Sequence, residues 1–173
     1  MNTLHTPLTE SEIKLLPLRV WSNNGTTYAE FLAYKDARVD VRRLNETYGD
    51  SWEVDVDPIV TDSLVFFKVS LNINGTRRST VVGAPVSSIT DENAVKALVS
   101  DGLKRAGFLW GIGLELYDFP RIIIRVPNEY VYESKNGNPS IKDRFLRELR
   151  LELNEDGTVR VFHKENMLFE GRR

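Results

Sequence analysis

Turn signals divide much of this chain into β-hairpins. Asn24-Gly25 and Asn74-Gly75 each lie between two extended runs, and residues 154–157 (Asn-Glu-Asp-Gly) form a third junction of this kind. Asn-Gly readily adopts the positive φ angles that a two-residue hairpin turn requires. Each junction therefore predicts two neighbouring antiparallel strands, which restricts the chain to folds that contain an antiparallel sheet.

Helical patterns lie between and after these hairpins. Residues 36–48 carry apolar side chains at spacings of three and four, which predicts a helix with one apolar face. The longest such pattern runs from Asp91 to about Trp110, with Thr90 as its cap. A short helix is also predicted over residues 9–16, because Thr9 and Glu12 have the spacing of a capping box.

The order of these elements predicts an α+β fold. A hairpin and a helix are followed by three strand-like runs (residues 52–56, 64–73 and 76–82) and then the long helix, which is typical of an antiparallel sheet packed on a helix. After Pro120 the pattern is weaker: it predicts a strand over 122–126, a helix over 141–149 and the third hairpin. We therefore expect a core domain of residues 1–127 and a C-terminal αβ appendage of residues 128–173.

Composition excludes several kinds of site. The 173 residues include no cysteine and only two histidines, so a disulfide framework, a thiolate zinc site and a histidine-based metal centre are not expected. We expect neither a metal nor a cofactor. The first nine residues lack the pattern of a signal peptide, and no apolar run reaches the roughly 18 residues that span a bilayer. A cytoplasmic protein without a membrane partner is expected, in the host cytoplasm if it is viral.

Charge is strongly segregated along the chain, although the formal net charge is only −2. Residues 46–62 include six acidic residues and no lysine or arginine, whereas residues 63–90 include no acidic residue at all. A nucleic-acid binder with so little net charge has to concentrate its cations on one surface. Basic residues on a helix are more often simply solvated, however, so the charge pattern alone leaves both interpretations open.

Two segments carry a family resemblance. Residues 100–106 (SDGLKRA), followed by residues 110–113 (WGIG), closely resemble the core motif of the Sak-type phage annealases, relatives of the eukaryotic Rad fifty-two annealing protein. Residues 32–38 (LAYKDAR) and residues 43–52 resemble the first conserved block of the same family. The likeness extends from about Val20 to Pro120, which is more than half of the chain.

The resemblance implies both an architecture and a binding mode. Members of the family build a β-β-β-α core and assemble into rings or helical filaments, with single-stranded DNA in a basic groove, phosphates inward and bases outward. The implied DNA contacts are Arg38, Lys104 and Arg105. Phe108 stands where the eukaryotic relatives carry a further arginine, so that contact is expected to be absent or replaced. The charge pattern adds further candidates: Lys35, Arg42, Lys68, Arg77, Arg78 and Lys96.

The resulting hypothesis is a non-enzymatic, ATP-independent protein that binds single-stranded DNA and anneals complementary strands in recombination, repair or replication. A bacteriophage or bacterial homo-oligomer fits this hypothesis, with an exonuclease or a single-strand binding protein as a partner. One alternative is an architectural or end-protecting DNA-binding protein without annealing activity. Another is a metal-dependent nuclease, which the scattered carboxylates disfavour.

Several residues have a structural interpretation beside a functional one. Gly111-Ile112-Gly113 follows a predicted helix, which favours a helix end over a phosphate loop. Asp101 lies four residues before Arg105, which favours an ion pair over a metal ligand. Asp55 and Asp57 alternate with valines and are expected on the wet face of a strand, where they could meet a neighbouring subunit. His163 is expected to be solvated.

Overall fold

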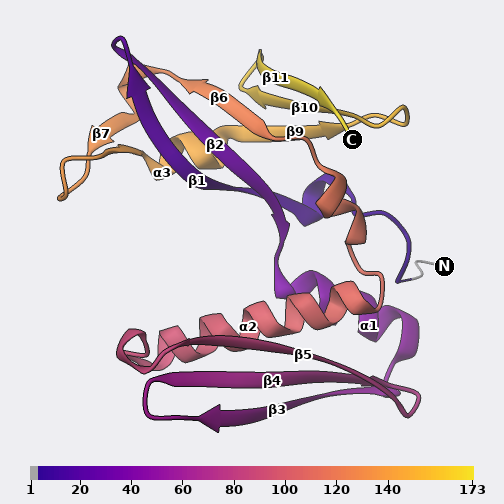
Figure 1. Cartoon of the computed structure of the whole chain (residues 1–173). Helices are drawn as coiled ribbons and strands as arrows, with labels where there is room; N and C mark the ends of the chain where they lie inside the picture. Colours follow the sequence, from indigo (N-terminus) through magenta and orange to yellow (C-terminus); the bar gives the residue numbers. More distant parts are fainter. Residues whose placement is uncertain (1–3) are drawn as a thin grey trace. The chain divides into compact units, whose positions relative to one another are not determined.

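The computed structural model describes residues 4–173, and the described chain divides into two compact units (Figure 1). Unit 1 contains the described residues up to Leu8 together with Lys35–Leu114, and unit 2 contains Thr9–Tyr34 and Glu115–Arg173. Each unit combines helix with antiparallel sheet, which confirms the α+β class. The contacts do not divide the chain at residue 127, because the first hairpin groups with the C-terminal segments. Whether residues 1–127 fold without the rest stays a prediction.

A three-stranded antiparallel sheet forms the base of unit 1. Its strands are β3 (Trp52–Val60), β4 (Leu64–Ile73) and β5 (Thr76–Pro85), in the order β3-β4-β5. Asn74 and Gly75 join β4 to β5 with φ angles of 50° and 78°, the positive values of the predicted hairpin turn. The three predicted strands and their connection are therefore confirmed.

Helix α2 (Glu92–Leu109) packs on one face of this sheet. Gly102 lies so close to β4 and β5 that a Cβ atom there would collide with the side chain of Val69. The missing side chain thus sets how closely helix and sheet approach. The sheet contributes the buried residues of this layer, which are Val65, Phe67, Val69 and Val82. The partly buried residues packed against them come mainly from the helix and are Ile89, Val95, Leu98, Val99 and Leu103.

The ends of α2 depend on side-chain and backbone caps. Asp91, rather than the predicted Thr90, caps its start by accepting hydrogen bonds from the backbone N–H groups of Asn93 (2.9 Å) and Ala94 (3.0 Å). At its other end Gly111 has φ 89°, its N–H donates to Phe108, and the N–H of Ile112 donates to Gly107. This double pattern is a Schellman motif, so the interpretation of residues 111–113 as a helix end is confirmed.

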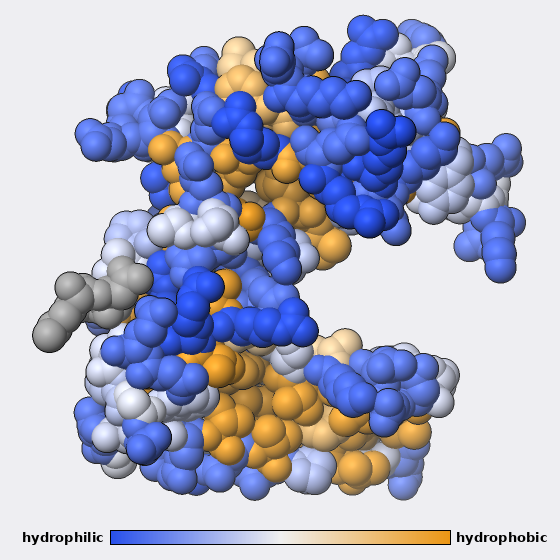
Figure 2. Space-filling view, turned by 180° about the vertical axis from the view of Figure 1, so that it is seen from behind, coloured by the Kyte–Doolittle hydropathy of each residue, from blue (hydrophilic) through white to orange (hydrophobic). Residues whose placement is uncertain are grey.

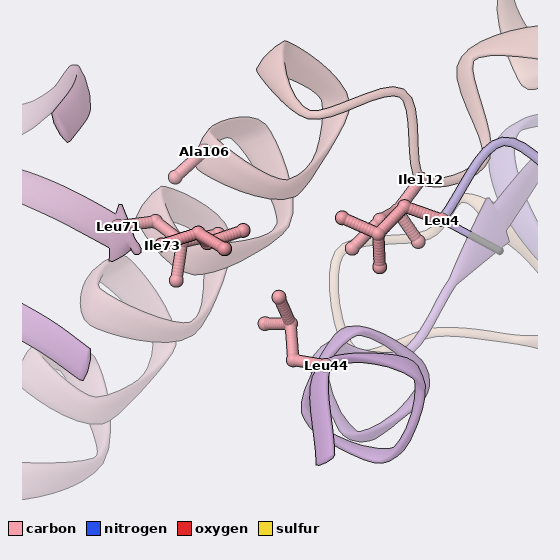
Figure 3. Packing of buried hydrophobic residues seen from close by; sticks show 6 residues of the cluster. All are labelled: Leu4, Leu44, Leu71, Ile73, Ala106 and Ile112. Carbon is pink, nitrogen blue, oxygen red and sulfur yellow. The ribbon is translucent and has the colours of Figure 1, made fainter. Parts of the chain in front are cut away.

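Helix α1 (Ala37–Tyr48) packs beside α2 through a second apolar cluster. Figure 3 shows Leu44 of α1 directed toward a group formed by the end of β4, the last turns of α2 and the segment after it. These contacts explain the apolar face predicted for residues 36–48. The members of the cluster are Leu4, Leu44, Leu71, Ile73, Ala106 and Ile112, with Tyr48, Trp52 and Trp110 packed against it.

Unit 2 contains three small sheets and one short helix. The first hairpin, β1 (Ile13–Asn23) and β2 (Thr26–Lys35), pairs through β2 with β6 (Ile122–Val126), and the order is β1-β2-β6. A second sheet has the order β11-β10-β9, which confirms the predicted hairpin at residues 154–157. The remaining elements are β7 (Val131–Glu133), β8 (Pro139–Ile141), α3 (Asp143–Glu148), β9 (Leu149–Leu153), β10 (Thr158–His163) and β11 (Asn166–Arg172).

The prediction of a helix over residues 9–16 is wrong. The capping box does form, with the Thr9 N–H donating to the Glu12 carboxylate at 2.9 Å, but only a 3-10 turn over Glu10–Glu12 follows it. From Ile13 onward the chain enters β1, because pairing with β2 satisfies its backbone and buries Ile13. Long-range pairing thus overrides a genuine local start signal.

His163 is buried rather than solvated, which corrects the prediction. Its ring lies within 5.0 Å of the ring of Tyr130 and 4.9 Å of that of Phe145, measured between centroids. Its Nε2 lies 2.8 Å from the Glu148 carboxylate, which also accepts hydrogen bonds from Arg144 and the Tyr130 hydroxyl. The hydrogen bonds from Arg144 and His163 lower the pKa of Glu148 to about 2.

Because of the Glu148 carboxylate, we expect unit 2 to lose stability in acid. The Glu148 pKa falls from 4.5 in the unfolded chain to about 2, so its stabilisation is present above pH 4.5 and is lost as the pH falls toward about 2. We expect urea unfolding to show a steeper loss of stability over this range for the wild type than for Glu148→Gln. Glu155→Gln, at an exposed turn, should behave like the wild type. Equal slopes for Glu148→Gln and the wild type would contradict this role.

Candidate nucleic-acid interface

Arg38 lies at the first turn of α1. The Asp36 side chain caps this helix by accepting a hydrogen bond from the backbone N–H of Arg38 at 3.0 Å. The Arg38 side chain is 91% exposed, and its Nη1 lies 3.5 Å from a carboxylate oxygen of Asp36. An exposed pair at this distance costs little to separate, so the guanidinium can reach an anion in solution.

Lys104 and Arg105 share one carboxylate on α2. Asp101 lies 3.6 Å from the Lys104 ammonium and accepts a hydrogen bond from Arg105 Nε at 2.8 Å. The ion pair between Asp101 and Arg105 confirms the structural interpretation of Asp101. The Lys104 side chain is 26% exposed and that of Arg105 is 54% exposed. Asp101 thus contacts two cations on this turn of the helix.

Lys35 does not belong to the surface, which corrects its place among the candidate DNA contacts. Its side chain is fully buried and its ammonium donates to the carboxylate of Asp40, which is also fully buried. Burial lowers the pKa of Lys35 and raises the pKa of Asp40 to about 6, while the charge of each partner acts in the opposite direction. A buried ammonium held in this way cannot contact a phosphate.

The buried pair joins the start of α1 to the last turns of α2. The Lys35 ammonium also donates to the backbone carbonyl of Lys104 at 3.2 Å and lies 4.4 Å from the centre of the Phe108 ring. Gly107 allows this approach, since a Cβ atom there would collide with the Asp40 carboxylate. The start of α1, which carries Arg38, therefore lies beside the turn of α2 that carries Lys104. The Phe108 ring packs against the Lys35 ammonium, at the position where the resemblance implies an arginine.

Two further candidates lie on the helices, and the side chain of a third, Arg78 on β5, contacts the end of α2. Arg42 is exposed one turn beyond Arg38 on α1. Lys96 is exposed near the start of α2, where it pairs with Glu92 at 2.9 Å. Arg78 donates to the backbone carbonyl of Leu109, and its guanidinium lies 4.3 Å from the ring centre of Trp110. The side chain of Arg78 thus extends along the end of α2.

Lys68 and Arg77 lie on the opposite face of the sheet. Phe67 and Val69 are buried beneath α2, so Lys68 between them points away from that helix. Arg77 is on the same outer face, where it lies 3.2 Å from Asp55 and 3.7 Å from Asp57. The wet-face interpretation of these two aspartates is confirmed. The structure therefore separates Lys68 and Arg77 from the cations of the helices.

Residues 4–173 contain no group of three or more His, Asp or Glu side chains that could hold a metal ion. None of the helices in that range is long and apolar enough to cross a bilayer.

Comparison with known proteins assigns the family. The family described as "Rad52/22 family double-strand break repair protein" matches residues 15–135, and the chain belongs to this family. This confirms the resemblance seen in the sequence motifs.

Two curated relatives share similar sequence. The "Single-stranded DNA-binding protein DdrA" of Deinococcus radiodurans is 33% identical over 99 residues, 57% of this chain and 46% of the relative. The protein of the same name from Deinococcus deserti is 36% identical over 93 residues, 54% of this chain and 45% of the relative. The matched region thus covers less than half of each relative's length. No solved structure matches the chain.

Proposed function

We propose that this protein binds single-stranded DNA through the start of α1 and the second half of α2, and that it anneals complementary strands without ATP. The observation that carries the proposal is the buried pair of Lys35 and Asp40 with its hydrogen bond to the Lys104 carbonyl, because it joins the start of α1 to the second half of α2. Membership in a double-strand break repair family and similarity to two proteins named for single-stranded DNA binding support it.

The chemistry of these residues suits a phosphate chain. Arginine offers phosphate a planar pair of donors, and lysine adds a compact charge. Each phosphate that they neutralise releases counterions, which favours binding at low salt. Contacts to phosphate alone leave the bases accessible, as pairing with a second strand requires. Annealing needs no bond chemistry, so the protein acts in this proposal as a binding protein and not as an enzyme.

The proposal includes assembly into a ring or filament of identical subunits. One subunit offers only a few cations, so it can cover only a few nucleotides. Repeating the site around an oligomer multiplies weak contacts by effective concentration. An exonuclease that produces single strands, or a single-strand binding protein, is the kind of partner with which such an assembly would work. Electron microscopy with and without single-stranded DNA tests for the assembly.

The central test is Lys104→Ala combined with Arg105→Ala. Both side chains are partly exposed, so we expect an unchanged circular dichroism spectrum and thermal midpoint. Affinity for labelled single strands should fall alike for all sequences, and the plot of log affinity against log salt should become shallower by about 1.4, or about 0.7 for each lost phosphate contact. Lys135→Ala with Lys164→Ala removes two exposed lysines from unit 2 and is the matched control. Unchanged binding by the folded double variant would refute the site.

A second measurement separates annealing from simple coating. Complementary labelled strands are mixed with the protein in the absence of ATP, and duplex formation is followed by fluorescence transfer. We expect the wild type to accelerate pairing and the Lys104→Ala, Arg105→Ala variant to lose that acceleration. Tight binding without acceleration would support the architectural or end-protecting alternative instead.

A further inference from the structure

The outer face of the β1-β2-β6 sheet in unit 2 combines aromatic rings with cations. Along β2 the residues Ala29 and Phe31 are buried, so Tyr28 and Glu30 point to the other face. On β6, Ile124 and Val126 are buried in the same way, which leaves Arg125 exposed beside Tyr28, its cross-strand partner. The face that carries Tyr28 and Arg125 is thus the solvent side of the sheet.

An aromatic pair lies at the centre of this face. The rings of Trp21 on β1 and Tyr28 on β2 are stacked, with centroids 5.9 Å apart and planes inclined by 22°. The guanidinium of Arg19 lies 4.8 Å from the centre of the Trp21 ring. The strand order is β1-β2-β6 (Figure 1), so Tyr28 on the middle strand lies between Trp21 on β1 and Arg125 on β6. Both rings are only partly buried, so ring surface remains accessible.

The charge of this face is positive. Glu30 accepts two hydrogen bonds from Arg121, at 2.6 and 3.0 Å, and lies 3.4 Å from Arg19. The hydrogen bond from Arg121 is the main cause of the lowered Glu30 pKa. The side chains of Arg19 and Arg121 are both 60% exposed. No ion pair joins Arg125 to another residue within 4–173, so three guanidinium groups stand against one carboxylate.

We propose that this face is a second binding surface for single-stranded nucleic acid, separate from the cations of unit 1. We call it the hairpin platform and define it by Arg19, Trp21, Tyr28, Arg121 and Arg125. Bases would stack on the two rings while the arginines contact the flanking phosphates, which is how aromatic residues on an open sheet surface bind unpaired strands. Every base has a flat face, so this mode of binding tolerates any sequence.

The platform differs in chemistry from the site in unit 1. In unit 1 the proposed contacts are cations alone, whereas here two partly buried rings lie beside guanidinium groups. A cross-strand aromatic pair also stabilises a hairpin. That role alone requires neither the excess of positive charge nor the exposed Arg125 beside the rings. A protein with both surfaces could contact two strands or two parts of one strand.

The test uses the full chain and a short labelled thymidine oligonucleotide, with an abasic oligonucleotide of equal length as a second probe. Residual affinity is measured in the Lys104→Ala, Arg105→Ala background, with and without Tyr28→Leu and Arg125→Gln. Loss of one stacked base is expected to weaken thymidine binding by about five-fold or more, and to affect the abasic probe much less. Tyr132→Leu with Arg147→Gln, exposed side chains of the same unit, is the matched control.

Photo-cross-linking gives a readout that a purely structural role would not produce. A thymidine strand carrying iodouracil should cross-link to the peptide that contains Trp21 or Tyr28, in the wild type and in the Lys104→Ala, Arg105→Ala variant. Arg125→Gln breaks no ion pair and should keep the thermal midpoint, so it tests the platform even if Tyr28→Leu fails to fold. Equal binding of the abasic probe, or no cross-link at either ring, would overturn the platform.

The possible results distinguish a failure of the platform proposal from a failure of the site proposed in unit 1. If the platform variants bind normally while Lys104→Ala, Arg105→Ala loses affinity, the platform is wrong and the proposed function stands. If the reverse holds, the site in unit 1 is wrong and the platform stands. Equally tight binding of a polyglutamate peptide would show a general polyanion surface and would also overturn the assignment to nucleic acid.

Discussion

Replacing Lys35 with methionine should reduce the free energy of unfolding by about 3–5 kcal/mol, because it leaves the buried Asp40 carboxylate without its partner. The two groups lie in the interior of unit 1, between α1 and the Gly107 turn of α2. Methionine fills a volume similar to that of lysine, so the loss arises from the unpaired charge rather than from a cavity. Denaturant unfolding followed by the fluorescence of Trp52 and Trp110, both in unit 1, measures it.

The pH dependence identifies the carboxylate as the cause. Burial raises the pKa of Asp40 from 3.8 to about 6, so its contribution to stability decreases as the pH rises through this range, while the unfolded chain ionises first. Without Lys35 this pKa should rise further. The difference between Lys35→Met and the wild type should therefore be largest near about pH 8 and smaller near about pH 5.

Two controls make this prediction specific. Lys35→Met combined with Asp40→Leu removes both charges and should recover much of the lost stability. Lys68→Met changes an exposed lysine of the same unit and should remain within about 0.5 kcal/mol of the wild type. A Lys35→Met variant that is equally destabilised at both pH values would show that the unpaired carboxylate is not the reason.

Phe145→Ala should destabilise unit 2 by about 3–5 kcal/mol, the usual cost of deleting a buried aromatic ring. Phe145 on α3 is fully buried, and its ring lies 5.1 Å from that of Tyr130 and 4.9 Å from that of His163. The alanine variant leaves a cavity beside the buried imidazole and its hydrogen bond to Glu148. Thermal and urea unfolding followed by Trp21 fluorescence, in a chain whose Trp52 and Trp110 are replaced by phenylalanine, measure the loss in this unit.

A graded series provides the comparison for Phe145. Phe145→Leu keeps most of the volume and should cost clearly less than the alanine variant. Tyr132→Ala removes an exposed aromatic ring from β7 and should stay within about 0.5 kcal/mol of the wild type. If Phe145→Ala costs no more than Tyr132→Ala, the ring does not belong to the core of unit 2.

The elements that local sequence signals specify were predicted well. The Asn-Gly turns, the α1 helix with its apolar face and the long α2 helix are all present. Such elements depend on backbone preference, on side-chain periodicity and on caps within a few residues, which a single sequence displays directly. The helix expected over residues 9–16 failed for the opposite reason, because the pairing of β1 with β2 lies beyond the range of its capping box.

The DNA contacts of the candidate site stay a prediction. The family motifs indicated Arg38, Lys104 and Arg105, and the structure leaves all three accessible to solvent. Nothing in the sequence indicated that Lys35 pairs with Asp40, because both belong to a polar stretch that is typical of a solvated helix start. The sequence does contain an indication of the aromatic pair in the hairpin platform. Trp21 and Tyr28 are placed symmetrically about Asn24-Gly25, which makes them neighbours across the hairpin.

By itself, the sequence determined the hairpins, the two longer helices, the α+β class and the family. These follow from turn chemistry, periodicity and motifs that act over short stretches of chain. Only the tertiary structure decided which charges are buried, which face of each sheet remains in water and which distant segments share a unit. Those outcomes depend on desolvation and on strand pairing between residues far apart in the chain. The sequence by itself does not distinguish a lysine that pairs with a carboxylate in the core from a lysine that faces solvent.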